Sequence, residues 1–137
     1  MDAAAIRNGV TAYAQTKRMQ VILTELLARR WARAGIAVHA MHPGWADTPS
    51  VRSSIPRFWQ VMRQRLRTPE EGADTIVWLA VAPALPSGRF WFDRAPQPTH
   101  LLPLTAEQPR DRARLWRMCT GLAGLAPTSE DQRSEHA

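Results

Sequence analysis

The sequence predicts an α/β fold with a parallel sheet. Apolar residues recur at helical spacing over about residues 11–34, and Gly35 then ends the predicted helix. A short run over residues 36–41, mostly apolar and partly β-branched, follows directly and predicts a buried strand. A helix, a glycine and a buried strand in this order are half of a parallel β-α-β unit.

The first ten residues are mostly small and polar, with Gly9 near their end, and they predict a loop. The long helix that follows has a continuous apolar stripe, as expected of a helix that packs one face against a core. The stripe consists of Met19, Ile22, Leu23, Leu26, Leu27 and Trp31.

Residues 50–66 predict an irregular to helical segment that is interrupted at Pro56. It could be a mobile flap over a site or a plain surface helix. The next helix has a strong start signal, because Thr68 suits the N-cap, Pro69 the first helical position and Glu71 a capping box. This helix is predicted to continue to about residue 81.

Two prolines break the chain after that helix, and residues 89–92 predict a last strand. The proline-rich residues 93–103 predict an extended loop, and about residues 109–122 a basic amphipathic helix. Residues 127–137 are polar and predict a disordered tail. We therefore expect one partial domain over residues 1–126, with its core in residues 11–103.

Length and composition exclude several classes of protein. A chain of 137 residues with 45% hydrophobic content forms at most one globular domain. The single cysteine, Cys119, excludes an internal disulfide and fits a reducing compartment. No apolar run is long enough to cross a bilayer, and the first residues are not a signal peptide, so we expect a cytoplasmic protein without a membrane span.

The formal net charge of +6 would permit contact with nucleic acid, but the arginines are scattered and lack interleaved aromatic residues. We therefore expect no nucleic-acid partner. We attribute the basic balance mainly to solvated helix faces and an arginine-rich composition, with an incidental advantage for phosphate-bearing ligands. The histidines have no metal-ligand spacing, and no Ser–His–Asp order with a nucleophile elbow is present.

Tyr13 is the only tyrosine and Lys17 the only lysine in a chain with seventeen arginines. Their offset of four places both side chains on one face of a helix, one turn apart. A phenol is a weak acid at neutral pH, and a nearby ammonium group favours its ionised form, so such a pair can exchange a proton with a carbonyl or alcohol oxygen. The alternative is an exposed tyrosine and a solvated lysine that happen to share a face.

A second candidate site is the turn over residues 42–49, directly after the first predicted strand. Pro43 and Gly44 end the strand and turn the chain. Ligands of open α/β sheets bind outside the carboxyl ends of the strands, where Thr48 would offer a hydroxyl and a backbone N–H. An ordinary strand-ending turn is an equally good interpretation of these residues alone.

Together, four motifs in order resemble the C-terminal half of a short-chain dehydrogenase/reductase, and most closely the member-12-like branch. The likeness covers about residues 11–103, and its joint order is far more specific than any single motif. It implies the C-terminal portion of a Rossmann-like doubly wound parallel sheet whose N-terminal dinucleotide-binding half is missing. The motifs are Tyr13-x-x-x-Lys17, Gly35 before a strand, Pro43-Gly44-Trp45-Ala46-Asp47-Thr48, and Thr68-Pro69-Glu70-Glu71 before a helix.

The resemblance implies an oxidoreductase that transfers hydride between NAD or NADP and a small-molecule carbonyl or alcohol. Tyr13 would be the general acid and base, and Lys17 would hold the nicotinamide ribose and promote ionisation of the phenol. Backbone groups of Pro43, Gly44 and Trp45 would meet the nicotinamide end, and Thr48 would bond the cofactor's amide or phosphates. Residues 50–66 would cover the substrate, and the helix over residues 13–34 would serve dimerisation.

The sequence also departs from the family pattern. None of its seven glycines forms a Gly-rich phosphate turn between a strand and a helix, and no serine precedes Tyr13. Two candidate strands cannot form an independent sheet. We therefore expect the isolated chain to be marginally stable, prone to associate and inactive.

Two alternatives to the oxidoreductase hypothesis stay open. One is a non-catalytic dimerisation or interaction module of the same family, and the other is a basic helical binder of nucleic acid.

Overall fold

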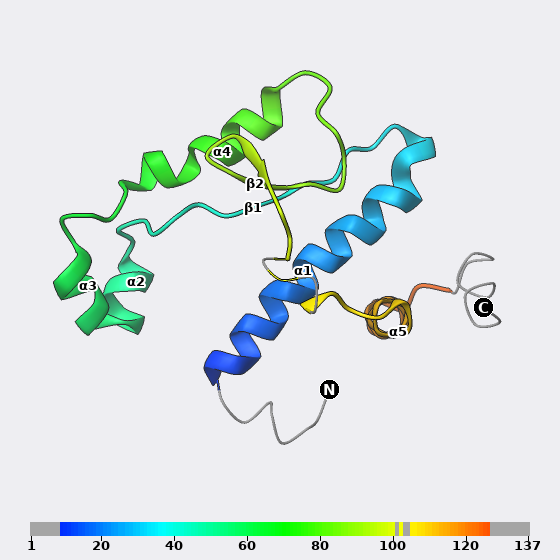
Figure 1. Ribbon diagram of the computed structural model, residues 1–137, viewed down its shortest axis with the longest axis horizontal. Helices are drawn as coiled ribbons and strands as arrows, with labels where there is room; N and C mark the ends of the chain where they lie inside the picture. Colours follow the sequence, from blue (N-terminus) through cyan, green and yellow to red (C-terminus); the bar gives the residue numbers. More distant parts are fainter. Residues whose placement is uncertain (1–8, 101, 103–104, 127–137) are drawn as a thin grey trace.

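A computed structural model describes residues 9–100, 102 and 105–126 (Figure 1). It has five α-helices in this part of the chain and one small mixed sheet of three strands: β1 (Ala40–Met41), β2 (Phe90–Phe92) and β3 (Ala95–Gln97), in that order across the sheet. The predicted α/β class is therefore confirmed, but the sheet is mixed and not wholly parallel as predicted, because its last strand pairs antiparallel with its neighbour. The loop predicted over residues 1–8 and the disordered tail predicted over residues 127–137 lie outside the described residues.

Helix α1 spans Gly9–Trp31, and a short 3-10 helix, η2, continues it over Ala32–Ala34. Gly9 and Val10 therefore belong to the helix, so the prediction of a loop there is wrong. Gly35 has φ +69° and donates its N–H to the Ala32 carbonyl at 3.1 Å, which confirms it as the residue that ends the helix.

Strand β1 covers Ala40–Met41 and pairs in parallel with β2, Phe90–Phe92. The last predicted strand is thus confirmed to within one residue. The first strand, predicted over residues 36–41, is much shorter, because the backbone hydrogen bonds of Val38 do not follow the sheet ladder. Ser87 Oγ accepts the Val38 N–H at 2.9 Å, and the Val38 carbonyl accepts the Gly88 N–H at 2.8 Å. These contacts replace regular ladder pairing ahead of Ala40.

Strand β3, Ala95–Gln97, pairs antiparallel with β2, so the extended loop predicted over residues 93–103 is wrong at this point. The turn between the two strands is made by Asp93 and Arg94, which have φ of 50° and 58°. Such turns usually contain glycine, which explains why the sequence did not signal a hairpin. Pro96 fits because β3 is an edge strand, where a missing N–H is tolerated.

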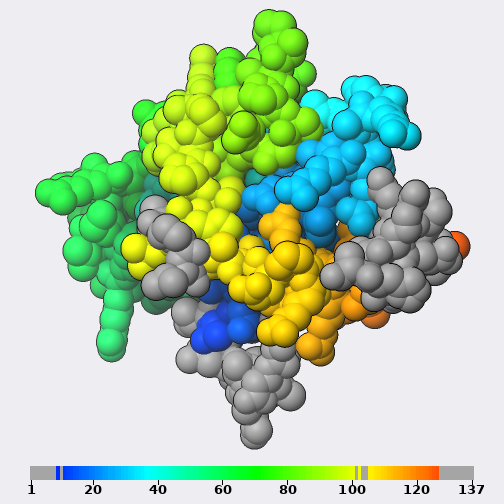
Figure 2. Space-filling view, turned by 45° about the vertical axis from the view of Figure 1, so that its right-hand side comes forward, coloured from blue at the N-terminus to red at the C-terminus, as the bar shows by residue number. Residues whose placement is uncertain are grey.

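Helices α2, Pro49–Ser54, and α3, Pro56–Met62, meet at the predicted break and project to one side of the molecule (green in Figure 2). Helix α4 spans Pro69–Val81, and its capping box is confirmed. Thr68 Oγ1 accepts the Glu71 N–H at 3.2 Å, and Glu71 Oε2 accepts the Thr68 N–H at 2.8 Å. Helix α5, Pro109–Leu122, matches the predicted basic amphipathic helix.

Helices α4 and α1 cover opposite faces of the sheet (Figure 1). On one face Trp91 is buried, and its ring centroid lies 5.3 Å from that of Trp78 on α4. Side chains alternate along a strand, so Phe90 points to the other face, where it borders a pocket together with Glu25 of α1. The close approach of α1 is visible at Gly88, where a Cβ would lie 3.1 Å from the Ala28 Cβ.

The main apolar cluster lies between α1 and α5. Ile22 and Leu26 of α1 are buried against Leu115 of α5, and Met19, Leu23, Trp116 and Cys119 pack around them. Each fully buried aliphatic side chain contributes about 1.5–3 kcal/mol to the free energy of unfolding. None of the described helices is both long and apolar enough to span a membrane.

A polar network ties α1 to the segment that precedes α5. Arg18 donates hydrogen bonds to the Glu107 carboxylate, with Nη2 at 2.9 Å from Oε2, and to the Thr99 carbonyl at 2.7 Å. Its hydrogen bonds are the main reason why the pKa of Glu107 falls from 4.5 to about 2. A second ion pair, Arg112 with Glu25 at 2.6 Å, joins α5 to α1.

This network predicts a specific loss of stability in acid. The folded pKa of Glu107 lies below its ordinary value, so its contribution is present above about pH 4.5 and is lost as the pH falls towards about 2. Glu107→Gln should lower the free energy of unfolding at neutral pH and weaken its dependence on pH in that window. Urea unfolding at a series of pH values measures both effects.

Asp111→Asn is the matched control, because Asp111 is exposed on the first turn of α5. This variant should keep the acid dependence of the wild type. An unchanged pH dependence in Glu107→Gln would show that the Arg18 contact does not stabilise the fold.

Candidate functional site

Tyr13 and Lys17 lie one turn apart near the start of α1, as predicted. Lys17 Nζ is 5.7 Å from the centroid of the Tyr13 ring, and both side chains are exposed, Tyr13 by 65%. Within the described residues, Lys17 forms no ion pair, so its charge is not neutralised by a carboxylate there. The phenol and the ammonium group are therefore both open to solvent.

The segment after β1, residues 42–48, is called the β1 loop below. Gly44 has φ +76°, and its N–H donates to His42 Nδ1 at 2.9 Å. The loop is also bonded to the residue before α4, because Arg67 donates its N–H to the Trp45 carbonyl and accepts the Asp47 N–H, each at 2.8 Å. The backbone of the loop is therefore held in one shape.

Arg67 covers the loop with its side chain as well as its backbone. The guanidinium group pairs with Asp93, with Nη2 at 2.6 Å from Oδ2, and a Cβ on Gly44 would lie 2.7 Å from Arg67 Nε. This hydrogen-bonded pair holds the pKa of Asp93 below its usual range. A residue that sequence reasoning did not select thus closes one side of the β1 loop.

Thr48 and Asp47 connect the β1 loop to α2 and α3. Thr48 is the N-cap of α2, and its Oγ1 accepts the Val51 N–H at 3.3 Å. Asp47 accepts hydrogen bonds from Arg52 at 2.7 Å and from Trp59 Nε1 at 2.8 Å. The bond from Arg52 is the main cause of a lowered pKa at Asp47. The end of the loop therefore positions both helices over it.

A cleft of about 380 Å³ opens beside the β1 loop. Trp45 lines it and also packs against Phe58 of α3, with ring centroids 4.6 Å apart. Most of the lining is apolar, and the polar part includes two arginines. The lining residues are His42, Gly44, Trp45, Met62, Arg65, Leu66, Arg67 and Phe92.

Sequence reasoning had selected Gly44 and Trp45 by name, and the candidate segments 42–49 and 50–66 also contain the lining residues His42, Met62, Arg65 and Leu66. It missed Arg67 and Phe92, which lie outside both segments. No local pattern marks Phe92 as a site residue, since it alternates along an ordinary strand. Arg67 carried one weak signal, its position directly before the Thr68 cap.

Chain topology brings the two predicted groups to one end of the molecule. Only residues 35–39 separate η2 from β1, so the strand runs back along α1, and its carboxyl end lies towards the start of the helix. Figure 1 shows the first turns of α1 at the same end as α2 and α3. No hydrogen bond, ion pair or ring contact of the described residues joins Tyr13 or Lys17 directly to the β1 loop. No metal-binding cluster occurs among those residues either.

The geometry at Gly44 predicts a large effect of a single methyl group. Gly44→Ala should destabilise the protein by about 1–3 kcal/mol, because alanine strains the left-handed backbone and its Cβ would displace the Arg67 guanidinium group. Chemical unfolding measures the change.

Gly121→Ala is the control, because Gly121 lies in α5 without a positive φ and with nothing within 4 Å of an added Cβ. That variant should be neutral or more stable by up to about 1 kcal/mol. Equal effects at the two glycines would argue against the described loop geometry.

The chain is similar to dehydrogenases and reductases of known sequence. It is 50% identical over 122 residues to dehydrogenase/reductase SDR family member 12 of Bos taurus and 47% identical over 122 residues to its Homo sapiens counterpart; each alignment covers 85% of this chain and 37% of the relative. It is 35% identical over 144 residues to retinol dehydrogenase 13 of Homo sapiens, across 91% of this chain and 40% of the relative.

No protein-family profile matches the chain, and no solved structure matches it either. The chain spans well under half the length of the relatives named above. Their identity across most of this chain agrees with the ordered motifs of the sequence. The chain therefore belongs to the short-chain dehydrogenase/reductase family and resembles its member-12-like branch.

Proposed function

We propose that this chain carries the proton-transfer centre of an NAD(P)-dependent oxidoreductase that acts on a small-molecule carbonyl or alcohol. The observation that supports it best is the Tyr13–Lys17 pair, exposed near the start of α1 at the end of the molecule where the β1 loop lies. Relatives named as dehydrogenases and reductases add to this support.

Tyr13 is the acid and base of the proposal. In reduction its hydroxyl donates a proton to the carbonyl oxygen, and in oxidation the phenolate accepts a proton from the alcohol. The Lys17 ammonium group, 5.7 Å from the ring centroid, stabilises the negative charge that develops on the phenol oxygen during transfer. Lysine suits this place because it is a compact charge on a flexible stem that also reaches sugar hydroxyls.

The hydrogen-bonding groups of the site fit a nicotinamide cofactor, NAD or NADP. Thr48 Oγ1 accepts one bond from Val51, and its hydroxyl proton remains to be donated to an amide or phosphate oxygen. Backbone groups of Pro43, Gly44 and Trp45 would meet the nicotinamide end, with the Gly44 N–H already used by His42. Lys17 would bind the ribose hydroxyls. The cofactor supplies the hydride in reduction and takes it up in oxidation.

The proposed substrate is a largely apolar carbonyl compound or alcohol. The cleft beside the β1 loop is lined by Trp45, Met62, Leu66 and Phe92, and Arg65 and Arg67 provide its positive charge. Residues of α3 and the segment after it would cover the bound substrate, in line with the role proposed for residues 50–66. Desolvation of these apolar side chains favours a substrate with a matching apolar surface.

We assign the activity to the complete polypeptide and not to the 137 residues alone. The chain spans 37% of its member-12 relatives, and its sequence has no Gly-rich phosphate turn. The proposal includes a cytoplasmic location, in keeping with the single cysteine, and self-association through α1. A non-catalytic interaction module, the second interpretation, would bind no nicotinamide cofactor.

Tyr13→Phe tests the proposal in the full-length protein. Removal of the hydroxyl should lower kcat by about 10²–10⁴-fold, while the affinity for NAD(P)H changes little, because the ring and Lys17 remain. Steady-state assay against a panel of apolar ketones and aldehydes gives kcat, and cofactor fluorescence gives the affinity. A variant with near-normal turnover would remove Tyr13 from the mechanism, and a wild type that binds neither NADH nor NADPH would favour the interaction module.

Lys17→Arg tests the lysine separately. The charge is kept, but the planar guanidinium group cannot replace the compact ammonium group, so both turnover and cofactor affinity should fall by about tenfold or more. Arg33→Lys, a reverse exchange in the exposed 3-10 turn after α1, should leave both unchanged. Full activity of Lys17→Arg would mean that the only lysine of the chain is incidental.

A further inference from the structure

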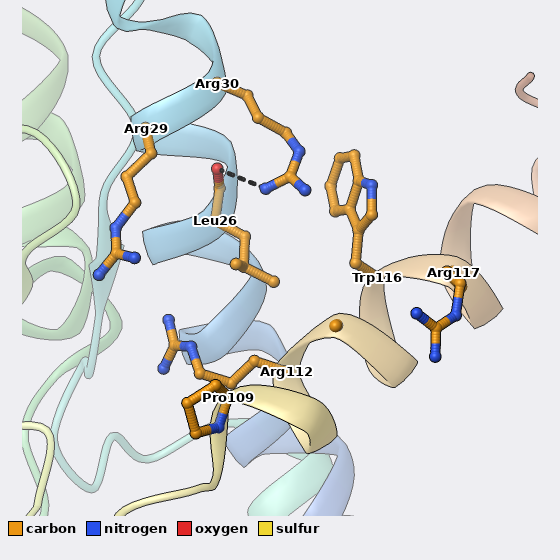
Figure 3. A pocket seen from close by; sticks show the side chains of 8 residues that line it. Leu26, Arg29, Arg30, Pro109, Arg112, Trp116 and Arg117 are labelled. Atoms are coloured by element: carbon orange, nitrogen blue, oxygen red, sulfur yellow. Dashed lines mark hydrogen bonds between the residues drawn. The ribbon is translucent and has the colours of Figure 1, made fainter. Parts of the chain in front are cut away.

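Two clefts in the described part of the chain are each lined by more than one arginine, and they hold these side chains differently. In the cleft of about 420 Å³ between α1 and α5, Arg29 and Arg117 lie on opposite sides (Figure 3), and Arg112 pairs with Glu25 at 2.6 Å. In the cleft beside the β1 loop, by contrast, the Arg67 side chain lies directly on the loop backbone. Only the second arrangement links one arginine side chain to the backbone of a candidate site.

Arg67 contacts four residues of the β1 loop, two through its backbone and two through its side chain. Its backbone N–H donates to the Trp45 carbonyl, and its carbonyl accepts the Asp47 N–H, each at 2.8 Å. Its side chain donates from Nη1 to the Pro43 carbonyl at 3.5 Å, and a Cβ added to Gly44 would lie 2.7–2.9 Å from its Nε, Cδ and Cζ atoms. The first half of the loop therefore rests on the Arg67 side chain.

Phe92 and Asp93 hold that side chain in place. The guanidinium group lies over the Phe92 ring, 4.9 Å from its centroid, and forms paired hydrogen bonds with the Asp93 carboxylate, with Nη2 at 2.6 Å from Oδ2. Asp93 follows the carboxyl end of β2, which lies beside the carboxyl end of β1 because the two strands pair in parallel. Its φ is 50°, a conformation that aspartate tolerates better than most residues with a Cβ, so the hairpin turn can place a carboxylate there.

We propose that Arg67, held by Asp93, positions the β1 loop for the nicotinamide cofactor. The inference rests on the proposed function, in which backbone groups of Pro43, Gly44 and Trp45 meet the nicotinamide end. A loop that is already fixed in its binding form loses less conformational freedom when the cofactor binds, so its affinity is higher than that of a loop that must first become ordered. Arg67 is a positioning residue and not a catalytic residue, because its guanidinium group is already bonded to Asp93 and to the loop.

Arg67→Gln and Asp93→Asn test this role in the full-length protein. Each substitution removes the paired hydrogen bonds but keeps the backbone bonds of residue 67 to the loop, so each variant should fold, which circular dichroism verifies. The dissociation constant of the reduced cofactor that the wild type binds, NADH or NADPH, should rise about tenfold in each variant, as measured by cofactor fluorescence. The double variant should bind no more weakly than the single variants, because the two side chains act through one contact.

Hydrogen exchange provides a second measurement, on the cofactor-free protein. The amides of residues 42–48 should exchange about tenfold faster in both variants than in the wild type. Asp74→Asn is the matched control, because Asp74 accepts paired hydrogen bonds from Arg94 of the same hairpin turn, with Oδ2 at 2.8 Å from Nε. The Asp74 and Asp93 side chains are 45% and 50% exposed, and within the described residues Asp74 has no hydrogen bond or ion pair with the β1 loop. The control should change neither cofactor affinity nor exchange in the loop.

The outcomes separate the positioning role from the proposed function. A wild type that binds neither NADH nor NADPH would overturn both. A wild type that binds a cofactor, with unchanged affinity and loop exchange in Arg67→Gln, would overturn the positioning role alone. A loss of affinity in Arg67→Gln that Asp93→Asn does not reproduce would indicate direct contact with the cofactor and would also overturn it, as would an equal loss in Asp74→Asn.

Discussion

The reversal of the chain at Gly35 is the constraint on which the rest of the structure depends. The left-handed backbone at this residue, φ +69°, ends the helical segment, and five residues later the chain enters β1 in the opposite direction. Glycine adopts this conformation without the steric cost that a Cβ would add. Because of the reversal, the start of α1 and the end of β1 face the same way. Tyr13 and the β1 loop share one end of the molecule for this reason, although thirty residues of sequence separate Tyr13 from Pro43.

Several arginine side chains hold loops in place by pairing with aspartates. Arg67 with Asp93 covers Gly44, Arg52 with Asp47 ties α2 to the β1 loop, and Arg94 with Asp74 ties the hairpin turn to α4. Exposed ion pairs are worth little individually, but the paired hydrogen bonds of a guanidinium group to a carboxylate also set direction. The apolar core is small by comparison, since the buried cluster contains only Ile22, Leu26 and Leu115 among the described residues. Polar contacts therefore determine the shape of the candidate site more than apolar packing does.

Helix α1 presents different side chains at its two ends and in its middle. Its first turns expose a phenol and an ammonium group, which suit proton exchange, and its last turns contribute two arginines to a cleft shared with α5. Between them the helix is buried by α5 and by the sheet, so the middle is structural.

The sequence by itself determined the helices, the capping box, the break at Pro56, the parallel order of the first and last predicted strands and the family, because these follow from local spacing, from Gly and Pro chemistry and from motifs in a fixed order. The site residues Tyr13, Lys17, Pro43, Gly44, Trp45 and Thr48 were also selected from sequence, and their roles stay predictions. Only the tertiary structure decided that β1 pairs over two residues and that a hairpin places Pro96 in an edge strand. It also decided that the Arg67 side chain packs over Gly44 and that a cleft forms between α1 and α5. The hairpin turn lacks the glycine that would have signalled it, and the other features bring together residues that are distant in the chain. Neither hydrophobic periodicity nor motif spacing indicates which distant side chains will be in contact.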